Sequence, residues 1–600
     1  MPEARGRPQA DLFTRSERSL SNGRVRMPIV FLALVAFAAV VRAGVVLNTV
    51  LDPDESQHLH TAWLVGEGQR PFADFWEHHT PLLHYLLAPL TWWWPDSPAV
   101  YYAARVVMTL FAAVALLLLY RLARRLSATA AMASVVLLAV LPRFVENTTE
   151  VRPDVPGLAV WIGSLTALAI WRESGRAAWL SVAGLALGVW GLLTPKAVYG
   201  ALGVAAAVLV AGLGRGGPGL GPVLVSLARL AAGAAAPLVL FLIGLGLAGG
   251  TRMLGGFVDQ VVVQNLTFAD LDRAGPVGEE GLGFLLLALA GVVLVVRREG
   301  RAVLRHPVHG SLLVPGLALA LVLLAPSTPA VYRHTWLPLL AVAAVYAGVA
   351  LAALLERGGA PAGRWRPLLL GGALLVALVV PASELVREAL RDRIQVQLRI
   401  MRLQLLHACQ GEPVLDGNAL YVFRPAAYRY RVLINGVRYW IANAVIPEEQ
   451  ILEDLVRARA RVGYADSRLR ALVGPVATFL ARHYVMTPEG LLVAGALIPV
   501  PGGSEGGRAY VELLAAGAYR LSASPGIAVE IDRARVSSPF VRVGAGRHEV
   551  TWTGPAGVIR IVAATCLERR VVEGDGVGGV IPEPGRGGPA PRAWDRASRR

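Results

Sequence analysis

Long apolar runs dominate the first two thirds of the chain. The runs Phe31 to Val41, Val107 to Leu119 and Leu312 to Ala325 contain no charged residue, which is typical of helices surrounded by lipid. About eleven such runs predict a polytopic α-helical membrane protein, with residues 28–383 as the transmembrane domain and residues 1–27 as an N-terminal tail. The expected spans are 28–48, 99–120, 128–142, 154–171, 177–195, 197–213, 222–249, 281–297, 310–326, 336–355 and 367–382.

The composition supports this fold class. Hydrophobic residues make up 55% of the chain and charged residues 17%, so a soluble fold would have to bury too much apolar surface. The net charge of +16 does not indicate nucleic acid, because the arginines lie mainly in short loops and no basic stripe alternates with aromatic residues. Membrane lipid is therefore an expected partner and nucleic acid is not.

The asymmetry of charge predicts an orientation. With the N-terminus inside the cell, basic residues of the inside segments outnumber those of the outside loops by more than two to one, as the positive-inside rule requires. The apolar stretch Pro81 to Trp94 is too short for a span and ends in three tryptophans, so we expect an interfacial or re-entrant helix there. Eleven spans then place everything after about Ser383 outside.

The pattern changes after the last expected span. Residues 384–498 mix helical and strand periodicities and predict an extracytoplasmic α/β domain, with an amphipathic helix at Glu448 to Arg461 and strands between Tyr421 and Trp440. Residues 508–566 show short strand-like segments between Gly and Pro turns, which favours a small β-sandwich. The Gly-, Pro- and Arg-rich tail, residues 573–600, is expected to be disordered.

The chain has two cysteines, Cys409 and Cys566, and both fall in the region expected outside. A CxxC motif is absent, so a thiolate metal cluster is not expected. A disulfide is chemically permitted in that compartment. Two unrelated buried thiols are an equally open interpretation.

Three carboxylates, Asp52, Asp54 and Glu55, follow the first expected span. Carboxylates so close repel one another, so at least one is expected to have a raised pKa or to bind a cation. Such a group is a candidate general base. A solvated acidic loop is an equally open interpretation at this point.

Further along the same loop lie Glu77, His78 and His79. These residue types are candidate metal ligands or phosphate partners, which makes a divalent metal ion a candidate cofactor. Adjacent histidines point in different directions on a helix, so they need not share a ligand. For a single histidine, an ordinary surface position is the commoner outcome.

Three charged residues in later outside loops complete the set of candidates. Asp154 enters the fourth expected span, where it favours the helix dipole, but charges at membrane depth are commonly functional. Lys196 is the only lysine in the chain, and a compact ammonium suits a point contact to phosphate, unlike a planar guanidinium. Arg333 precedes the tenth span and is a second candidate phosphate contact, or an interfacial anchor beside Trp336.

The order of these motifs resembles the class C glycosyltransferase superfamily (GT-C), above all its branch of protein O-mannosyltransferases and lipid A aminoarabinose transferases. The resemblance covers most of residues 28–382. Its features are the Asp54-Glu55 pair after the first span, the run Gly68 to Pro81, the Arg-Pro-Asp that ends at Asp154, Lys196 after the fifth span, and Arg333 before a late span.

The resemblance implies an inverting glycosyltransferase of the bacterial inner membrane, a hexosyl or pentosyl transferase. The donor would be a sugar on a polyprenyl-phosphate carrier, and the acceptor an extracytoplasmic lipid, glycan or protein. The implied roles are Asp54 as catalytic base beside Glu55, Asp154 as a second site carboxylate, Lys196, Arg333 and His78 as donor-phosphate contacts, and Glu77, His79 and Asp52 as substrate or metal contacts. Because Asp52 stands beside the usual pair, the assignment of the base stays open.

Two other functions fit parts of the pattern. A transporter or flippase of a lipid-linked sugar would use the same cations, but it needs no base after the first span, and the chain lacks matching Gly- or Pro-broken segments in two halves. A membrane-anchored envelope assembly or binding protein would act through its outer region. In that case the carboxylates of the first loop would be dispensable.

Overall fold

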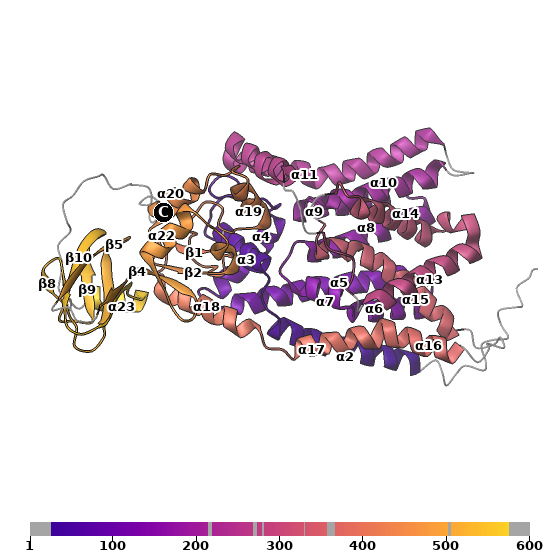
Figure 1. The fold of residues 1–600 in the computed structure, drawn as a ribbon. Coiled ribbons are helices and arrows are strands. Elements are labelled where there is room, and N and C mark those ends of the chain that lie inside the picture. The colour runs from indigo at the N-terminus through magenta and orange to yellow at the C-terminus, as the bar shows by residue number, and fades with distance from the viewer. Residues whose placement is uncertain are drawn as a thin grey trace, which may run out of the picture. The chain divides into compact units, whose positions relative to one another are not determined.

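The computed structural model describes residues 26–213, 219–267, 273–278, 281–328, 331–356, 366–501 and 506–574. The predicted tails, residues 1–27 and 573–600, lie almost entirely outside the described residues. The chain divides into two compact units (Figure 1). The membrane unit comprises Met1–Thr49, Arg105–Phe241 and Asp272–Arg393, and the head unit comprises Val50–Ala104, Leu242–Leu271 and Ile394–Arg600.

Helices occupy all eleven ranges predicted to span the membrane. Among the described residues, seven helices are long and apolar enough to cross a membrane, or eight if the pair α6 and α7, bent by 65°, is one span. The chain is thus a multi-pass integral membrane protein, but the number eleven is not confirmed. Helices α9 and α10 have only 16 and 17 residues, and α13 ends in three charged residues.

The helices of this part of the chain are α2 (Arg26–Asn48), α5 (Ala99–Ala123), α6 (Ala128–Ala139), α7 (Pro142–Thr149), α8 (Asp154–Ser174), α9 (Ala178–Leu193), α10 (Ala197–Leu213), α11 (Leu220–Phe257), η1 (Val258–Val263), α12 (Gln264–Thr267), α13 (Leu282–Glu299), η3 (Gly300–Leu304), α14 (Pro307–Leu324), η4 (Arg333–Trp336), α15 (Leu337–Glu356), α16 (Arg366–Leu374), η5 (Leu375–Val379) and α17 (Val380–Ala389).

Small residues allow these helices to pack closely. A Cβ atom added at Gly184 would lie 2.1 Å from the carbonyl oxygen of Leu230, and one at Gly291 would lie 1.9 Å from that of Tyr346. Glycine at these positions lets α9 approach α11, and α13 approach α15, to backbone contact. Such close approach is how helices associate in lipid, where the hydrophobic effect does not drive them together.

The head unit contains η1, α12 and the C-terminal end of α11, together with the helices α3 (Pro53–Gly66), α4 (Leu82–Trp93), α18 (Ile394–His407), α19 (Asn435–Ala442), α20 (Glu448–Ala458), α21 (Ser467–Arg470), α22 (Pro475–His483) and α23 (Cys566–Gly574). Its strands are β1 (Val414–Asp416), β2 (Val462–Tyr464), β3 (Tyr484–Met486), β4 (Leu491–Val500), β5 (Gly507–Leu513), β6 (Gly517–Ala523), β7 (Ala528–Ile531), β8 (Ala534–Arg535), β9 (Phe540–Val543), β10 (Gly546–Thr553) and β11 (Gly557–Ala563).

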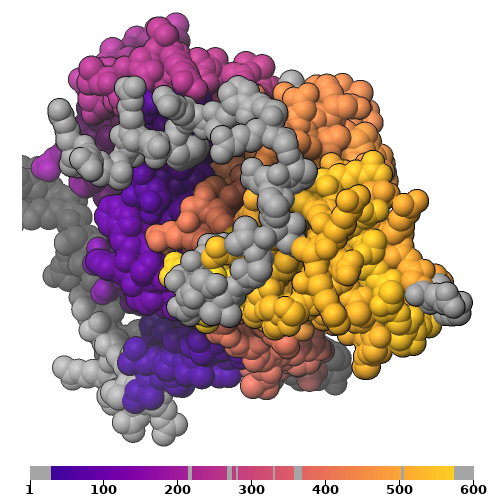
Figure 2. All heavy atoms as spheres, turned by 90° about the vertical axis from the view of Figure 1, so that its left-hand side faces the viewer, coloured from indigo at the N-terminus to yellow at the C-terminus, as the bar shows by residue number. Residues whose placement is uncertain are grey.

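The strands form one mixed sheet and one smaller sheet. The mixed sheet has the order β1-β2-β4-β11-β6-β9, with β3 paired to β4, and the second sheet has the order β5-β10-β7-β8. Strand β4 therefore pairs with β2 and β3 of the predicted α/β domain (the α/β part, residues 384–498). It also pairs with β11 of the predicted β-sandwich (the β part, residues 508–566). In Figure 2 the yellow β part borders the orange helical part, where α22 packs against β3, β4 and β5.

Two local predictions for the head unit have different outcomes. The amphipathic helix predicted from Glu448 is confirmed as α20. The strands predicted between Tyr421 and Trp440 are wrong, because this segment holds turns followed by α19. Val422 and Arg431 have φ angles of 45° and 60°, and such left-handed conformations interrupt an extended strand.

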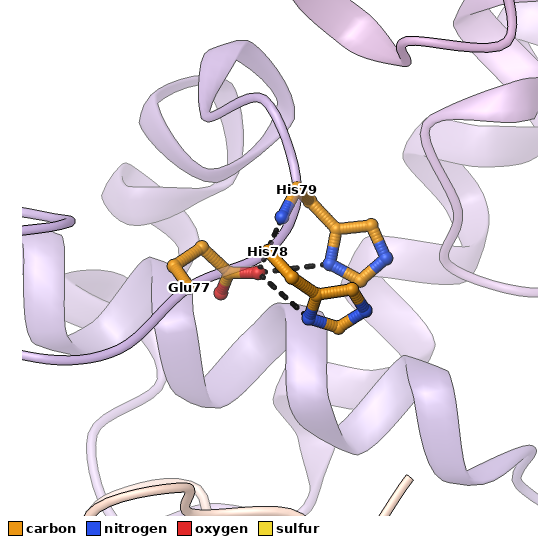
Figure 3. A group of neighbouring side chains, drawn as sticks. All are labelled: Glu77, His78 and His79. Carbon is orange, nitrogen blue, oxygen red and sulfur yellow. Dashed lines mark hydrogen bonds and ion pairs between the residues drawn. The ribbon is translucent and has the colours of Figure 1, made fainter. Parts of the chain in front are cut away.

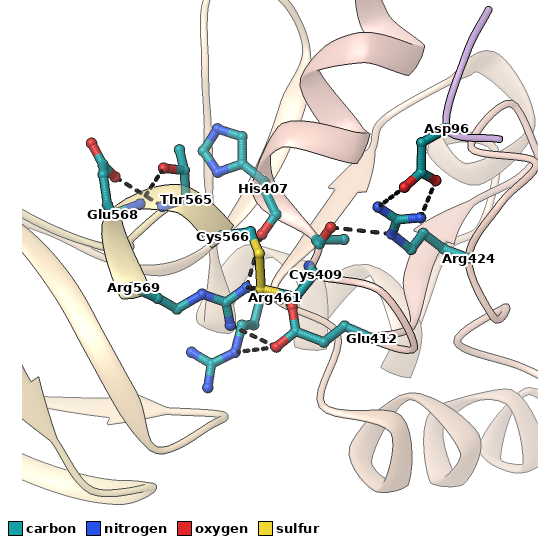
Figure 4. Close-up of a disulfide and its surroundings, with 11 residues drawn as sticks. Asp96, His407, Cys409, Glu412, Arg424, Arg461, Thr565, Cys566, Glu568 and Arg569 are labelled. Carbon is teal, nitrogen blue, oxygen red and sulfur yellow. Dashed lines mark hydrogen bonds and ion pairs between the residues drawn. A yellow bond between two sulfur atoms is a disulfide. The ribbon is translucent and has the colours of Figure 1, made fainter. Parts of the chain in front are cut away.

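Cys409 and Cys566 form a disulfide, which decides between the two interpretations of the cysteines (Figure 4). Their Cα atoms lie 5.1 Å apart, across a sequence separation of 157 residues. The guanidinium of Arg569 donates to both carboxylate oxygens of Glu412 beside the bridge, at 2.6 and 2.5 Å. The bridge and this ion pair fasten α23 to the segment that follows α18.

Candidate active site

Helix α3 begins with a capping box that uses two of the three predicted carboxylates. The side chain of Asp52 accepts from the backbone N–H of Asp54, and the buried side chain of Glu55 accepts from the N–H of Asp52, both at 2.9 Å. A capping box of this kind stabilises the helix start. Asp54 occupies the second helical position, where its carboxylate is partly exposed.

Asp54 lies on the same face of α3 as His58, four residues further on. Burial lowers the pKa of His58 well below its usual range, and the negative charge of Asp54 partly opposes this effect. The negative charge of Asp54 also partly opposes the lowering of the pKa of His78 by burial. The predicted base therefore lies close to a group of buried histidines.

Glu77, His78 and His79 lie together at the centre of this group, with ligand atoms all within 4.8 Å of one another (Figure 3). We call these three residues the loop-one cluster. Glu77 is fully buried, and its Oε1 accepts from the backbone N–H of His79 at 3.0 Å and lies 2.8 Å from His79 Nδ1. Its Oε2 accepts from the hydroxyl of Thr61 at 2.8 Å and from Arg431 at 3.0 Å.

The backbone of the loop-one cluster is held by amide side chains that follow α11. Gln260 accepts from the N–H of Glu77 at 2.9 Å, and Asn265 donates to the carbonyl of His78 at 2.7 Å. Gln264 accepts from the indole N–H of Trp76 at 2.8 Å. The loop is thus fixed by three polar groups whose function the sequence pattern did not indicate.

The charge state of the cluster follows from burial and pairing. Burial alone would raise the pKa of Glu77, but the hydrogen bond with His79 and the nearby positive charges outweigh it and hold this pKa well below its usual range. Burial lowers the pKa of His84 to about 4 and that of His60 to about 3. At neutral pH Glu77 is therefore a carboxylate, and the neighbouring His58 and His84, whose rings lie 2.9 Å apart, are buried histidines that burial keeps neutral.

The residues present do not fit a divalent metal ion, although their ligand atoms are close enough together. The two oxygens of Glu77 already face the four hydrogen-bond donors of His79, Thr61 and Arg431. One of these donors is a guanidinium, whose positive charge would repel the ion. We therefore derive no step through a metal ion.

A second group of candidates lies in the membrane unit, where Asp154, Lys196 and His334 form what we call the membrane-unit cluster. The ammonium of Lys196 lies 2.7 Å from His334 Nε2. Lys196 Nζ and His334 Nε2 each lie 3.8 Å from a carboxylate oxygen of Asp154. The three side chains are 20%, 8% and 11% exposed for Lys196, His334 and Asp154. The pocket at this position is lined by Asp154, Trp190, Lys196, Tyr199, Leu319, Thr335 and Pro338.

Helix ends bring the membrane-unit cluster together. Asp154 opens α8, Lys196 directly precedes α10, and His334 lies in η4 before α15. Asp154 and Lys196 were both predicted as site residues. Arg333 was also predicted as a phosphate contact. Its side chain is exposed, and its neighbour His334 lies against Lys196 in the cluster.

Residues 78–241 match a family model described as dolichyl-phosphate-mannose-protein mannosyltransferase. This segment contains His78, His79, Asp154 and Lys196. By its description, the matched family takes its sugar from a polyprenyl-phosphate carrier. The comparison with curated proteins found no match.

Solved structures of three membrane glycosyltransferases are similar to this chain. ArnT from Cupriavidus metallidurans, bound to undecaprenyl phosphate, has 14% identity and a TM-score of 0.49, over 79% of this chain and 98% of that chain. The apo oligosaccharyltransferase of Archaeoglobus fulgidus has 12% identity and a TM-score of 0.47, over 77% and 74%. Arabinosyltransferase EmbB from Mycobacterium smegmatis has 14% identity and a TM-score of 0.35, over 88% and 64%.

These TM-scores are all below 0.5, so the match to the family model is the more informative comparison. It agrees with the resemblance seen in the motifs: residues 78–241 of this membrane protein are similar to the GT-C family described as dolichyl-phosphate-mannose-protein mannosyltransferase.

Proposed function

We propose that this protein moves a hexosyl or pentosyl group, with inversion, from a polyprenyl-phosphate carrier to a hydroxyl of an extracytoplasmic lipid, glycan or protein. It would do so in a bacterial inner membrane, with its N-terminus in the cytoplasm and its C-terminal region outside. The family match over residues 78–241 supports the donor class.

The membrane-unit cluster carries this proposal. Among the 58 lysine and arginine residues, the only lysine lies 2.7 Å from His334 Nε2 and 3.8 Å from Asp154, inside the segment that matches the family. An ammonium held between an imidazole and a carboxylate has a fixed position, so it suits a point contact to a phosphate oxygen. Lys196 would stabilise the negative charge that grows on the carrier phosphate as it leaves.

The proposed base is Asp54. The acceptor oxygen would form a bond to the anomeric carbon while the bond from that carbon to the phosphate oxygen breaks, and the proton of the acceptor would pass to Asp54. We favour Asp54 because its charge acts on the buried His58 and His78, whereas Asp52 and Glu55 form the capping box. His79 would contact the acceptor and the buried Glu77 would hold His79 in place. His78 and Asp154 remain proposed site residues, and Arg333 has no role in this proposal.

Reconstitution in liposomes tests the proposal. Purified protein would be supplied with radiolabelled polyprenyl-phosphate sugars and a crude envelope fraction as the source of acceptors. We expect label to move from the carrier to the acceptor fraction, and Asp54→Asn to stop this transfer. If instead no donor yields a labelled product but labelled carrier crosses the bilayer, the protein is a flippase and the proposed base is wrong.

A further inference from the structure

Arg431 comes from the C-terminal region, yet its guanidinium is buried against the first loop of the head unit. Its side chain is 4% exposed. It donates to the carbonyl of Trp76 at 2.6 and 3.2 Å, to the hydroxyl of Thr61 at 3.1 Å and to Glu77 at 3.0 Å. It also lies over the ring of Phe75, 4.8 Å from the centroid. One side chain thus contacts both α3 and the segment that carries the loop-one cluster.

The backbone of Arg431 also points to a special role. Its φ angle of 60° is uncommon for a residue with a large side chain. Such a conformation persists only where the surrounding structure determines it, and it is frequent at functional sites. Here the strained backbone positions a charged side chain that contacts Glu77. Among the described residues of the C-terminal region, no other side chain makes such a contact.

The contact between Arg431 and Glu77 has a consequence for His79. Because Glu77 is ionised, its oxygens can only accept hydrogen bonds, so the proton between Oε1 and His79 must reside on Nδ1. In the neutral ring, Nε2 is then the atom that can accept a hydrogen bond. Arg431 and Thr61 hold the other oxygen of the same carboxylate and so prevent it from turning away from His79.

We propose that Arg431 is a positioning residue of the active site: by holding the Glu77 carboxylate, it fixes the orientation and tautomer of His79. The C-terminal region is therefore part of the catalytic apparatus. The role of His79 in turnover rests on the proposed transferase function, whereas the effect of Arg431 on the His79 ring does not.

A double-mutant cycle tests this inference. Glu77→Gln and Arg431→Met each leave one buried charge unpaired, so each single variant should unfold at a lower temperature, whereas the double variant should recover most of the loss. If Arg431 acts through Glu77, kcat should fall by about 100-fold in each single variant and by no more than that in the double variant. The unfolding temperature would then recover in the double variant while kcat would not. If Arg431 only stabilised the fold, kcat would recover together with the unfolding temperature.

Arg424 and Asp96 provide a matched control. Arg424 lies in the same segment, is equally buried, and donates to both oxygens of Asp96 at 2.5 and 3.3 Å. Arg424→Met with Asp96→Asn removes an ion pair whose arginine is as deeply buried as Arg431 and whose acid is 48% exposed, and this pair makes no contact with Glu77. We expect this double variant to keep the wild-type kcat and KM.

A second measurement does not depend on enzymatic activity. Solid-state NMR of ¹⁵N-histidine-labelled protein in lipid nanodiscs, with the signal assigned by His79→Asn, should show His79 protonated on Nδ1 in the wild type and as a mixture of tautomers in Arg431→Met. An unchanged tautomer would overturn the inference, as would additive losses of kcat or a fully active Glu77→Gln/Arg431→Met variant. If the wild type transfers no sugar but the tautomer changes, the proposed function fails and the positioning role stands.

Discussion

The two candidate clusters differ in how the chain assembles them. The membrane-unit cluster joins residues at the beginnings of helices, and its side chains remain 8–20% exposed. The loop-one cluster is more deeply buried, with Glu77 fully covered, and its partner Arg431 is separated from it by 354 residues. One cluster needs only the ends of membrane helices, whereas the other needs a separate C-terminal region to fold around it.

Because of this difference, we expect substitutions in the two clusters to affect different properties: ligand binding in one and the stability of the fold in the other. Removing the ammonium of Lys196, the most exposed side chain of the membrane-unit cluster, leaves Asp154 with His334 as a neighbour, so it should mainly weaken ligand binding. Removing one from the loop-one cluster leaves a buried charge without its partner, which strongly destabilises the fold. The predictions that follow use this contrast, in order of decreasing effect.

Among the variants that probe the contrast between the clusters, Lys196→Met should cause the largest loss. Without the ammonium, the leaving phosphate loses its charge partner, and we expect kcat/KM to fall by roughly 100- to 1000-fold. Lys196→Arg should recover only part of this loss, because a planar guanidinium cannot occupy the place of an ammonium 2.7 Å from His334. Thermal unfolding should change little in either variant. Transfer assays over a range of donor concentrations would test this, and wild-type activity of Lys196→Arg would contradict the phosphate role of the lysine.

Cys409→Ser with Cys566→Ser should act on stability instead. The disulfide closes a long loop across a sequence separation of 157 residues, and removing a bridge of this kind typically costs about 2–5 kcal/mol. Differential scanning calorimetry should show a lower unfolding temperature, while binding of undecaprenyl phosphate at low temperature should stay at the wild-type level. If the variant also lost its affinity for undecaprenyl phosphate, the membrane-unit cluster would depend on the stability of the head unit, and the contrast between the clusters would fail.

Asp416 should give the head unit a distinctive pH dependence. Burial and the nearby charge of Asp466 raise the pKa of Asp416 from 3.8 to about 8. The folded state therefore holds a proton that the unfolded chain releases, so this contribution to stability is complete below about pH 4 and is lost as the pH rises to about 8. Asp466 also accepts from the N–H of Gly417, which begins the segment that carries Arg431.

Asp416→Asn should remove this dependence. The unfolding temperature of the wild type, measured against the variant at each pH, should fall as the pH rises from about 4 to about 8. A constant difference between the two proteins across this range would show that Asp416 is ionised throughout.

Arg333→Met should have the smallest effect. The side chain of Arg333 is exposed, and its neighbour His334 makes the contact with Lys196. We expect kcat and KM for the donor to stay within about twofold of the wild type, as is usual for surface substitutions. A loss comparable to that of Lys196→Met would return Arg333 to the phosphate site predicted from the sequence.

The sequence predicted the parts of this molecule whose signals are local. Apolar runs located the helices, and the single lysine and the Arg-Pro-Asp motif located two members of the membrane-unit cluster. The capping role of Asp52 and Glu55 was missed, although the spacing Asp-Pro-Asp-Glu is a known cap signal. Nothing local could indicate Arg431, because its role depends on a contact across 354 residues, and the alternating pattern around it predicted strands that its left-handed backbone excludes.

The most direct test of the account compares binding and turnover in Asp54→Asn. On one reconstituted preparation, the affinity for a polyprenyl-phosphate sugar and the rate of its transfer would be measured together. The account predicts wild-type donor affinity and a transfer rate lower by roughly 100- to 10,000-fold, because only the general base is lost. Transfer at the wild-type rate would contradict the account and remove Asp54 from the mechanism.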